Sequence, residues 1–223
     1  LPEVRQQLLE GRYAEANDIA RQIQGPNAQA YQPLGNLYLD FGDEFSPTHY
    51  QRELDLNRAV VTTRYTVKGA TITREIFSSF LDQVIVMRIS ADQAGAIHFK
   101  AHVDTPHPHA TTIEKTTFIL TGKVPSSCEP INRNVADPVI YGEDAIRFEY
   151  RVRVVAEGGT VSQHDQTLEV ASATTVMLLI TAATSFNGFD QPPEKDPSPQ
   201  TIADLEAAAS QPYAALLERH IAD

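Results

Sequence analysis

The hydrophobic pattern between Leu34 and Thr184 does most to limit the fold of this chain. Over this stretch, hydrophobic and polar residues alternate in short segments rich in Val, Ile, Thr, Tyr and Phe. Alternation with a period of two places successive side chains on opposite faces of a β-strand. The segments with this pattern are residues 36–41, 50–56, 61–67, 71–78, 83–90, 97–103, 117–121, 146–155, 167–170 and 175–182.

Turn sequences separate these segments and indicate how the strands connect. Lys68-Gly69, Gln93-Ala94-Gly95 and Glu157-Gly158-Gly159 each stand between two alternating segments. Short β-branched strands joined by Gly-containing turns are typical of antiparallel sandwiches and barrels. The segment Val176 to Ile180 is hydrophobic on both faces, so we expect it in the middle of a packed sheet. We therefore predict a mainly β fold, a large antiparallel β-sandwich (super-sandwich).

The two ends of the chain have a helical period instead. Hydrophobic residues at helical spacing predict a helix over 1–24 with a break at Gly11, and another helix over 201–221 that restarts at Pro212. Four prolines between 187 and 199 predict a loop. The expected division is a helical segment packed on the sandwich (1–30), the β-sandwich (31–186), a Pro-rich loop (187–200) and a C-terminal linker helix (201–223).

Composition excludes several classes of function. The 223 residues hold 18 Lys and Arg against 29 Asp and Glu, a formal charge of −11, which argues against binding to nucleic acid. The longest hydrophobic run, Val176 to Ala183, is too short to cross a membrane, so we expect no membrane partner. The single cysteine, Cys128, excludes an internal disulfide and a Cys-based zinc cage. Because the first residue is Leu and not Met, we expect either a processed product or, in preference, a piece of a longer protein.

A group of histidines is the most evident candidate for metal binding. His98 and His102 share one face of a predicted strand, and His107 and His109 follow in a Pro-containing loop with Asp104 nearby. Imidazole and carboxylate groups at this density can bind a divalent metal. However, Lys100 stands between the first two histidines, and four residues of strand separate their rings by about 13 Å. An exposed polar face is the preferred interpretation, and we expect no metal and no other cofactor.

Other catalytic patterns are weak. The sequence has neither a Gly-x-Ser-x-Gly elbow nor a glycine spacing that would hold phosphates. Glycoside hydrolysis needs two carboxylates, and the candidates are Glu53 with Asp55 on one strand face and three acids in a loop-rich stretch, Asp137, Glu143 and Asp144. Charged residues that alternate along a strand usually form its solvated face, so we predict no catalytic residue in this chain.

The loop after the most hydrophobic strand is the preferred candidate for a contact site. It carries two aromatic rings, an amide and a carboxylate around a glycine: Phe186, Asn187, Phe189 and Asp190. Such groups suit stacking on a sugar or packing against a neighbouring domain, and functional residues concentrate on loops held by a rigid scaffold. The alternative is a structural turn whose phenyl rings complete the core.

Several ordered blocks of the sequence together resemble one family, glycoside hydrolase family 95, the α-L-fucosidases. The blocks are residues 1–16 (LPEVRQQLLEGRYAEA), 31–41 (YQPLGNLYLDF), 50–56 (YQRELDL), 65–77 with Thr73-Arg74-Glu75, 82–86 (DQVIV), 182–186 (AATSF) and 219–223 (RHIAD). The resemblance covers essentially the whole chain and includes the N-terminal β-sandwich that is similar to that of glycosyl hydrolase family 65.

This resemblance implies a non-catalytic N-terminal domain. Enzymes of the family remove terminal, typically 1,2-linked α-L-fucose with inversion, and their catalytic acid and base lie in an (α/α)₆ barrel that follows the sandwich. No position of this chain corresponds to those catalytic residues. The expected partners are the barrel of the same polypeptide and, through it, a fucosylated oligosaccharide, and the expected location of such an enzyme is periplasmic or secreted.

Two other functions stay open at this point. One is an independent carbohydrate-binding module, against which the absence of Trp counts, because exposed aromatic platforms usually carry sugar stacking. The other is a metal-binding domain built on the histidines.

Overall fold

The computed structural model describes residues 1–23, 31–42, 46–129 and 135–223. The chain divides into two compact units. One comprises residues 1–31 and 127–140, and the other comprises residues 32–126 and 141–223. None of the helices in the described part of the chain is long and apolar enough to cross a membrane.

The first unit contains two short helices and a two-stranded ladder. Helix α1 (Pro2–Leu9) and helix α2 (Tyr13–Arg21) are separated by a turn at Gly11, whose φ is +72°. This left-handed backbone favours glycine and interrupts the helix, so the predicted break is confirmed. Strand β9 (Ser127–Cys128) pairs with β10 (Val139–Ile140) in antiparallel fashion. Residue 24, where the predicted N-terminal helix ends, lies outside the described residues.

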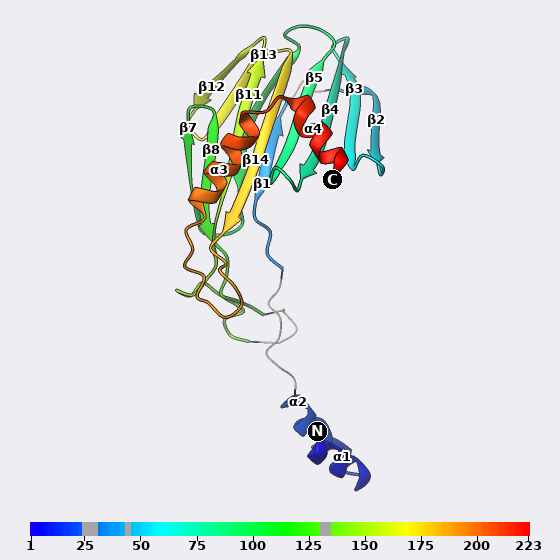
Figure 1. The fold of residues 1–223 in the computed structure, drawn as a ribbon, viewed down its shortest axis with the longest axis vertical. Coiled ribbons are helices and arrows are strands. Elements are labelled where there is room, and N and C mark those ends of the chain that lie inside the picture. The colour runs from blue at the N-terminus through cyan, green and yellow to red at the C-terminus, as the bar shows by residue number, and fades with distance from the viewer. Residues whose placement is uncertain (24–30, 43–45, 130–134) are drawn as a thin grey trace. The chain divides into compact units, whose positions relative to one another are not determined.

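The second unit is built on two antiparallel sheets (Figure 1). The larger sheet has eight strands in the order β2 (Thr48–Asp55), β3 (Val60–Val67), β4 (Ala70–Ser79), β5 (Val84–Ala91), β14 (Thr175–Thr184), β11 (Arg147–Glu157), β8 (Thr117–Lys123) and β7 (His109–Glu114). The smaller sheet has four, in the order β1 (Asn36–Asp40), β6 (Ile97–Asp104), β13 (Thr167–Ala173) and β12 (Thr160–His164). The predicted β-sandwich is confirmed.

The main hydrophobic core lies between the two sheets. The smaller sheet contributes alternate residues of β6 and β13, and the larger sheet contributes the corresponding residues of β5, β8, β11 and β14, among them Phe99, Phe118, Leu120, Phe148, Leu168 and Leu178. Along β6 the exposure of successive side chains alternates without exception. This regular alternation is what the period-two pattern of the sequence predicts.

A buried tyrosine connects the two layers. The hydroxyl of Tyr150 on β11 lies 3.2 Å from the carbonyl oxygen of Asp104 and 3.4 Å from that of Asn36. Burial, together with the nearby Asp104 carboxylate, raises the pKa of Tyr150 to about 12. The hydroxyl therefore stays protonated and donates to these carbonyl groups. Gly35 approaches the same ring so closely that a Cβ at this position would lie 2.7 Å from Tyr150 Cε1.

The C-terminal helices cover the other face of the larger sheet. Helix α3 (Ser198–Ala209) and helix α4 (Tyr213–Ala222) bury Leu205 and Leu216 against a second hydrophobic cluster of the sheet, formed by Val60, Phe77, Val84, Val86 and Leu179. Figure 1 shows both helices on this face. Strand β14 therefore faces hydrophobic layers on both sides, with Leu178 in the main core and Leu179 beneath the helices, as its sequence predicts.

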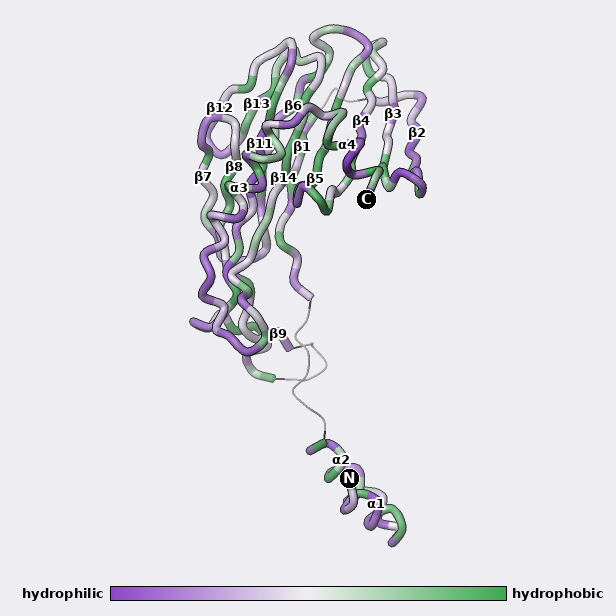
Figure 2. Tube along the Cα trace, viewed as in Figure 1, coloured by the Kyte–Doolittle hydropathy of each residue, from purple (hydrophilic) through white to green (hydrophobic). Residues whose placement is uncertain are grey.

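Two local features differ from the prediction. Strands β7 and β12 were not expected, because they are edge strands with mainly polar, exposed residues and weak alternation. Helix α3 begins at Ser198 rather than near residue 201, since Pro199 fits the first turn of a helix, where its missing N–H is not needed. The opposite edge strand, β2, is hydrophilic along most of its length (Figure 2).

Candidate functional site

The candidate loop leaves β14 at a firmly held point. Ser185 is buried and exchanges hydrogen bonds with Arg147 on the neighbouring strand β11. The Ser185 N–H donates to the Arg147 carbonyl at 2.8 Å, and the Arg147 N–H donates to Ser185 Oγ at 2.8 Å. A rigid strand end therefore presents the residues that follow.

Beyond Ser185 the side chains turn outward. Phe189 is 97% exposed and Phe186 is 55% exposed, and Asn187 and Asp190 are also exposed. Gly188, at φ +112°, has a backbone conformation that other residues rarely adopt. In the described structure, neither phenyl ring belongs to a hydrophobic core. The alternative in which these rings complete the core is therefore not what the structure shows for this loop.

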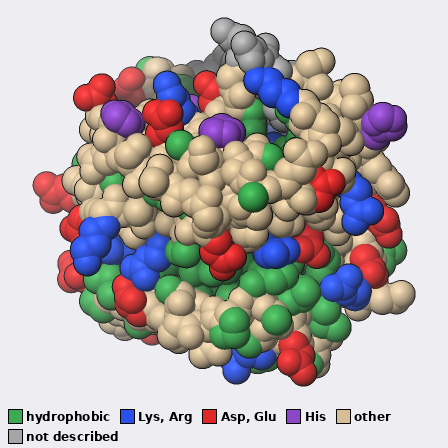
Figure 3. Space-filling model, turned by 90° about the horizontal axis from the view of Figure 1, so that it is seen from above, with side chains coloured by type: hydrophobic (Ala, Val, Ile, Leu, Met, Phe, Trp, Pro, Cys, Tyr) green, Lys and Arg blue, Asp and Glu red, His purple; other side chains and the backbone are tan. Residues whose placement is uncertain are grey.

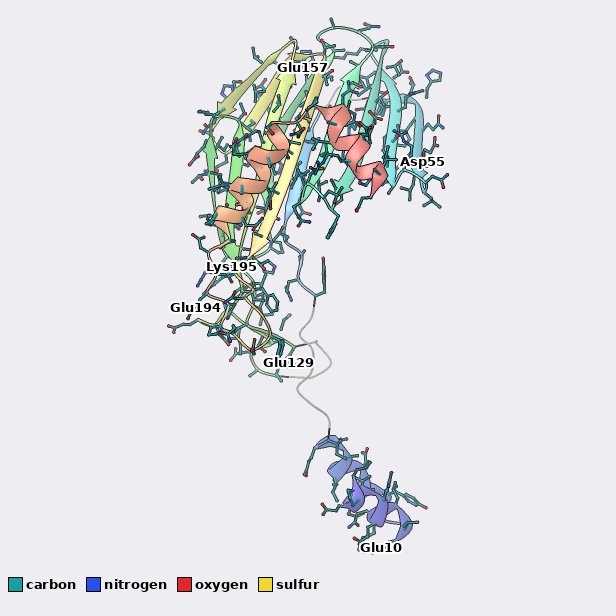
Figure 4. The ribbon with its side chains drawn as sticks, in the orientation of Figure 1. Glu10, Asp55, Glu129, Glu157, Glu194 and Lys195 are labelled. Atoms are coloured by element: carbon teal, nitrogen blue, oxygen red, sulfur yellow. The ribbon has the colours of Figure 1, made fainter. Side chains whose placement is uncertain are left out.

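The return of the loop to α3 is held by further hydrogen bonds. Arg147 Nη2 donates to the Glu194 carbonyl at 3.3 Å, and the Ser198 N–H donates to Asp196 Oδ1 at 3.0 Å. Glu194 and Lys195 lie at this end of the sandwich, whereas Glu157 lies at the other end (Figure 4). A shallow pocket of about 450 Å³ lies beside the loop, and its lining includes His109, Lys123, Arg147, Phe148, Asp196 and Ser198.

The opposite end of the sandwich, where Glu157 lies, has a surface of mixed charge (Figure 3). Seen from above, that end carries Lys and Arg side chains interspersed with Asp and Glu around a band of hydrophobic side chains (Figure 3). Basic side chains do not gather into a patch on this face, in keeping with the formal charge of −11.

The two strand histidines have separate surroundings. His98 and His102 both lie on the exposed face of β6. His98 Nδ1 accepts a hydrogen bond from the Ser172 N–H at 3.2 Å, and the His102 ring stacks on Tyr38 with 4.6 Å between ring centroids. Neither contact involves a second imidazole or a carboxylate, the groups with which a histidine would share a metal ion.

The two loop histidines are also engaged separately. His107 is 5% exposed, and its Nε2 lies 3.0 Å from the Pro33 carbonyl oxygen while its Nδ1 lies 3.3 Å from Tyr141 Oη. Since a carbonyl only accepts, His107 Nε2 carries the proton. His109 opens strand β7, with Nε2 3.6 Å from Asp104 Oδ1. Over the described residues, no three His, Cys, Asp or Glu side chains converge as metal ligands would.

The candidate carboxylates Glu53 and Asp55 lie on an edge strand of the larger sheet. Glu53 and Asp55 lie on the face of β2 that points away from the smaller sheet, opposite Thr62 and Val60 of β3. Asp55 Oδ1 accepts hydrogen bonds from the N–H groups of Asn57 and Arg58, which makes it a turn residue. Cys128 lies in the short ladder of the first unit.

Sequence reasoning missed a buried carboxylate beneath α3. Glu149 on β11 is 2% exposed. It accepts hydrogen bonds from Arg151 Nε at 2.7 Å, from Ser198 Oγ at 2.7 Å and from Thr201 Oγ1. Burial by itself raises the pKa of Glu149, but these hydrogen bonds and the Arg151 charge outweigh it, and the pKa is lowered. The ionised side chain therefore fastens the start of α3 to the sheet.

Comparison with known proteins identifies the family. The model of the family described as "Glycosyl hydrolase family 65, N-terminal domain" matches residues 1–188 of the 223. The chain belongs to this family. The matched residues include every strand of both sheets and the start of the candidate loop.

Two proteins that are similar to this chain are named as fucosidases. The chain is 32% identical over 240 residues to "Alpha-L-fucosidase 2" of Arabidopsis thaliana, covering 100% of this chain and 28% of that protein. It is 22% identical over 243 residues to "Probable alpha-fucosidase A" of Aspergillus niger, again with 100% and 28% covered. The chain thus spans about 28% of the length of these relatives.

A solved structure resembles the chain more distantly. A "Putative kojibiose phosphorylase from human microbiome" superimposes with a TM-score of 0.48 at 13% identity, covering 83% of this chain and 26% of the other. A similarity at this level supports no further inference.

Proposed function

We propose that this chain is the non-catalytic N-terminal β-sandwich domain of a glycoside hydrolase that releases terminal, 1,2-linked α-L-fucose. The observation that carries the proposal is the match of the entire chain to 28% of a protein named as an α-L-fucosidase, at 32% identity. The matching family model describes an N-terminal domain, which agrees with a place near the start of a longer polypeptide.

The work of the domain is to support and orient a linked catalytic (α/α)₆ barrel. Helices α3 and α4 suit this role, because Leu205 and Leu216 are buried on the larger sheet and Glu149 fastens the first turn of α3. The ion pair between Arg219 Nε of α4 and Asp82 Oδ1, at 3.0 Å, adds a contact near the end of the second helix. A segment held in this way leaves the sandwich in a fixed direction.

The loop with Phe186, Asn187, Phe189 and Asp190 contacts the barrel or the bound sugar. Support comes from the combination of a fixed base at Ser185 and side chains that point outward. The Phe189 ring is 97% exposed, and its burial against a partner would be energetically favourable. Asn187 offers both a donor and an acceptor to sugar hydroxyl groups.

The proposal is tested by the release of L-fucose from 2′-fucosyllactose. We expect the longer polypeptide that contains this chain to catalyse the reaction and the purified 223-residue chain to be inactive. Turnover by the 223-residue chain that is abolished by Glu53→Gln or Asp144→Asn would contradict the proposal, because it would place catalytic carboxylates in the sandwich.

An independent carbohydrate-binding module is the second candidate, and the exposed ring of Phe189 favours it. Titration of the 223-residue chain with L-fucose distinguishes the two functions. A binding module gives saturable binding that is lost in Phe189→Ala, whereas a supporting domain gives none.

A further inference from the structure

One dipeptide of the candidate loop has a chemistry of its own. Asn187 is followed by Gly188, and this is the only Asn-Gly pair in the 223 residues. Asparagine is among the thermolabile residues of proteins, because the backbone nitrogen of the next residue can attack its side-chain amide. A following glycine favours the attack, since it has no side chain to crowd the ring that forms. In a folded protein, the reaction depends on access to the amide and on the freedom of that nitrogen.

The structure leaves both reacting groups free. Strand β14 ends at Thr184, and Asn187 is exposed in a stretch that is neither helix nor strand. The Phe186 N–H still donates to Thr184 Oγ1, at 3.4 Å. Within the part of the chain that the structure describes, Asn187 and Gly188 make no hydrogen bond to protein through backbone or side chain. The amide and the nitrogen that would attack it are therefore held by no other group of the chain.

The turn itself requires the glycine that makes this pair reactive. Gly188 has a φ of +112°, a backbone conformation that L side chains rarely adopt. A Cβ at this position would also lie 3.3 Å from Asp190 Oδ1, which is a tight contact. A larger residue, which would slow the attack, is thus disfavoured at position 188 by the path of the loop.

The other asparagines that the structure describes lack this combination. Asn17 lies within α2 and Asn36 opens β1, where a regular backbone restrains the dihedral angles that ring formation has to change. Asn57 is exposed in a turn, like Asn187. However, the next N–H, that of Arg58, donates to Asp55 Oδ1 at 3.2 Å. Asn57 is therefore a natural control, with an accessible amide and an engaged nitrogen.

We propose that Asn187 is a site of spontaneous deamidation through a cyclic imide. The Gly188 nitrogen attacks Asn187 Cγ, and a C–N bond forms between them. The bond from Cγ to the side-chain nitrogen Nδ2 breaks, and Nδ2 leaves as ammonia with the proton that the Gly188 nitrogen loses. No oxidant or reductant takes part, and the chain supplies both reacting groups.

Water then opens the ring at one of its two carbonyl carbons. Opening at Cγ gives aspartate, whereas opening at the backbone carbonyl gives isoaspartate, in which the main chain runs through the former side chain. Either product adds one negative charge to a chain whose formal charge is −11, close to the acidic residues Asp190, Glu194 and Asp196. An effect on a barrel or sugar contact would rest on the proposed function, but the deamidation does not.

Peptide mapping by mass spectrometry tests the proposal on the folded 223-residue chain at neutral pH. Each site is compared with a short synthetic peptide of its own sequence, so that only the effect of the structure is measured. We expect Asn187 to deamidate within about threefold of its peptide, because nothing holds its reacting groups. Asn57 should be at least about tenfold slower than its peptide, since the Arg58 N–H must first leave the Asp55 carboxylate. Protection of Asn187 as strong as that of Asn57 overturns the proposal.

Two further measurements keep the test specific. Hydrogen exchange at the amides of β14 verifies that the incubated chain is folded. The peptide that gains about 1 Da should contain isoaspartate as well as aspartate, and aspartate alone contradicts the cyclic imide. Asn187→Gln keeps an amide but needs a larger ring, so it should abolish the acidic species, and its persistence at the parent rate overturns the proposal. These rates involve no fucose release, so a failure here is distinct from a failure of the proposed function.

Discussion

Glu149 and Ser198 meet across the boundary between the larger sheet and α3, with 2.7 Å between Glu149 Oε2 and Ser198 Oγ. Forty-nine positions separate them in the sequence. Together with Arg151 and Thr201, they place an ionised carboxylate under the first turn of a helix, at a site that is 2% exposed. A buried charge is stable only with such partners, so this contact defines where α3 begins to pack.

Removing the carboxylate should therefore be costly. Glu149→Ala leaves the largely buried Arg151 guanidinium without its carboxylate partner, and we expect a loss of about 3–5 kcal/mol in the free energy of unfolding, measured with urea. The matched control is Glu206→Ala, which removes the exposed partner of Arg153, 2.6 Å away. Exposed ion pairs contribute about 1 kcal/mol or less. Equal losses in the two variants would contradict the role given to Glu149.

The pH dependence of stability follows from the same group. The pKa of Glu149 is lower in the folded protein than its ordinary value of 4.5, so the folded state binds this proton less tightly than the unfolded state. The stabilisation is present above pH 4.5 and is lost as the pH falls through the lowered pKa. We expect unfolding curves between pH 6 and about pH 3 to show a steeper loss of stability for the parent than for Glu149→Gln. Parallel pH profiles of the two proteins would show that the carboxylate contributes no linkage.

The second hydrophobic cluster makes a separate prediction. Leu216 of α4 is fully buried against the larger sheet, whereas Ile202 of α3 is 43% exposed. Leu216→Ala should lower the free energy of unfolding by about 2–5 kcal/mol, because it removes buried surface and leaves a cavity. Ile202→Ala, the control of similar size, should change it by about 1 kcal/mol or less. Near-native stability of Leu216→Ala would mean that α4 does not depend on this contact.

The strands with strong alternation could be predicted from the sequence, and the weak ones could not. Strand β14 is apolar on both faces, and the structure places it between two hydrophobic layers, with Leu178 and Leu179 on opposite sides. Strand β12 consists of Thr160–His164 at the edge of the smaller sheet, and most of its side chains are exposed. Its pairing with β13 depends on tertiary position rather than on its own residues.

The buried site under α3 escaped prediction for a different reason. Glu149, Arg151 and Arg153 alternate with hydrophobic residues, and this pattern normally indicates a solvated strand face. Here α3 covers the polar face, and the charges are satisfied by one another and by Ser198 and Thr201. The only feature of the sequence that pointed to this site was a predicted C-terminal helix long enough to pack on a sheet. Such a helix does not by itself indicate which face of the sheet it covers.

The histidines should bind no structural metal, as expected from the sequence. In the structure, His107 bonds to Pro33 and Tyr141 while His102 stacks on Tyr38, so their rings are engaged with different partners. We expect elemental analysis after extensive dialysis to find no stoichiometric zinc. Zinc at one equivalent that is lost in His102→Ala with His107→Ala would instead support a metal-binding domain.

The candidate loop leads to the last prediction, made for the longer polypeptide. Phe189 is 97% exposed and touches no core, so Phe189→Ala should leave the melting temperature unchanged. If the loop contacts the barrel or the sugar, Phe189→Ala and Asn187→Ala should each lower kcat/KM for 2′-fucosyllactose by roughly tenfold, about 1.4 kcal/mol. Phe148→Ala is the contrasting variant, because its ring is 1% exposed and its truncation should cost about 3–5 kcal/mol of stability. Unchanged kinetics in both loop variants, with a normal melting temperature, would show that these side chains contact neither the barrel nor the substrate.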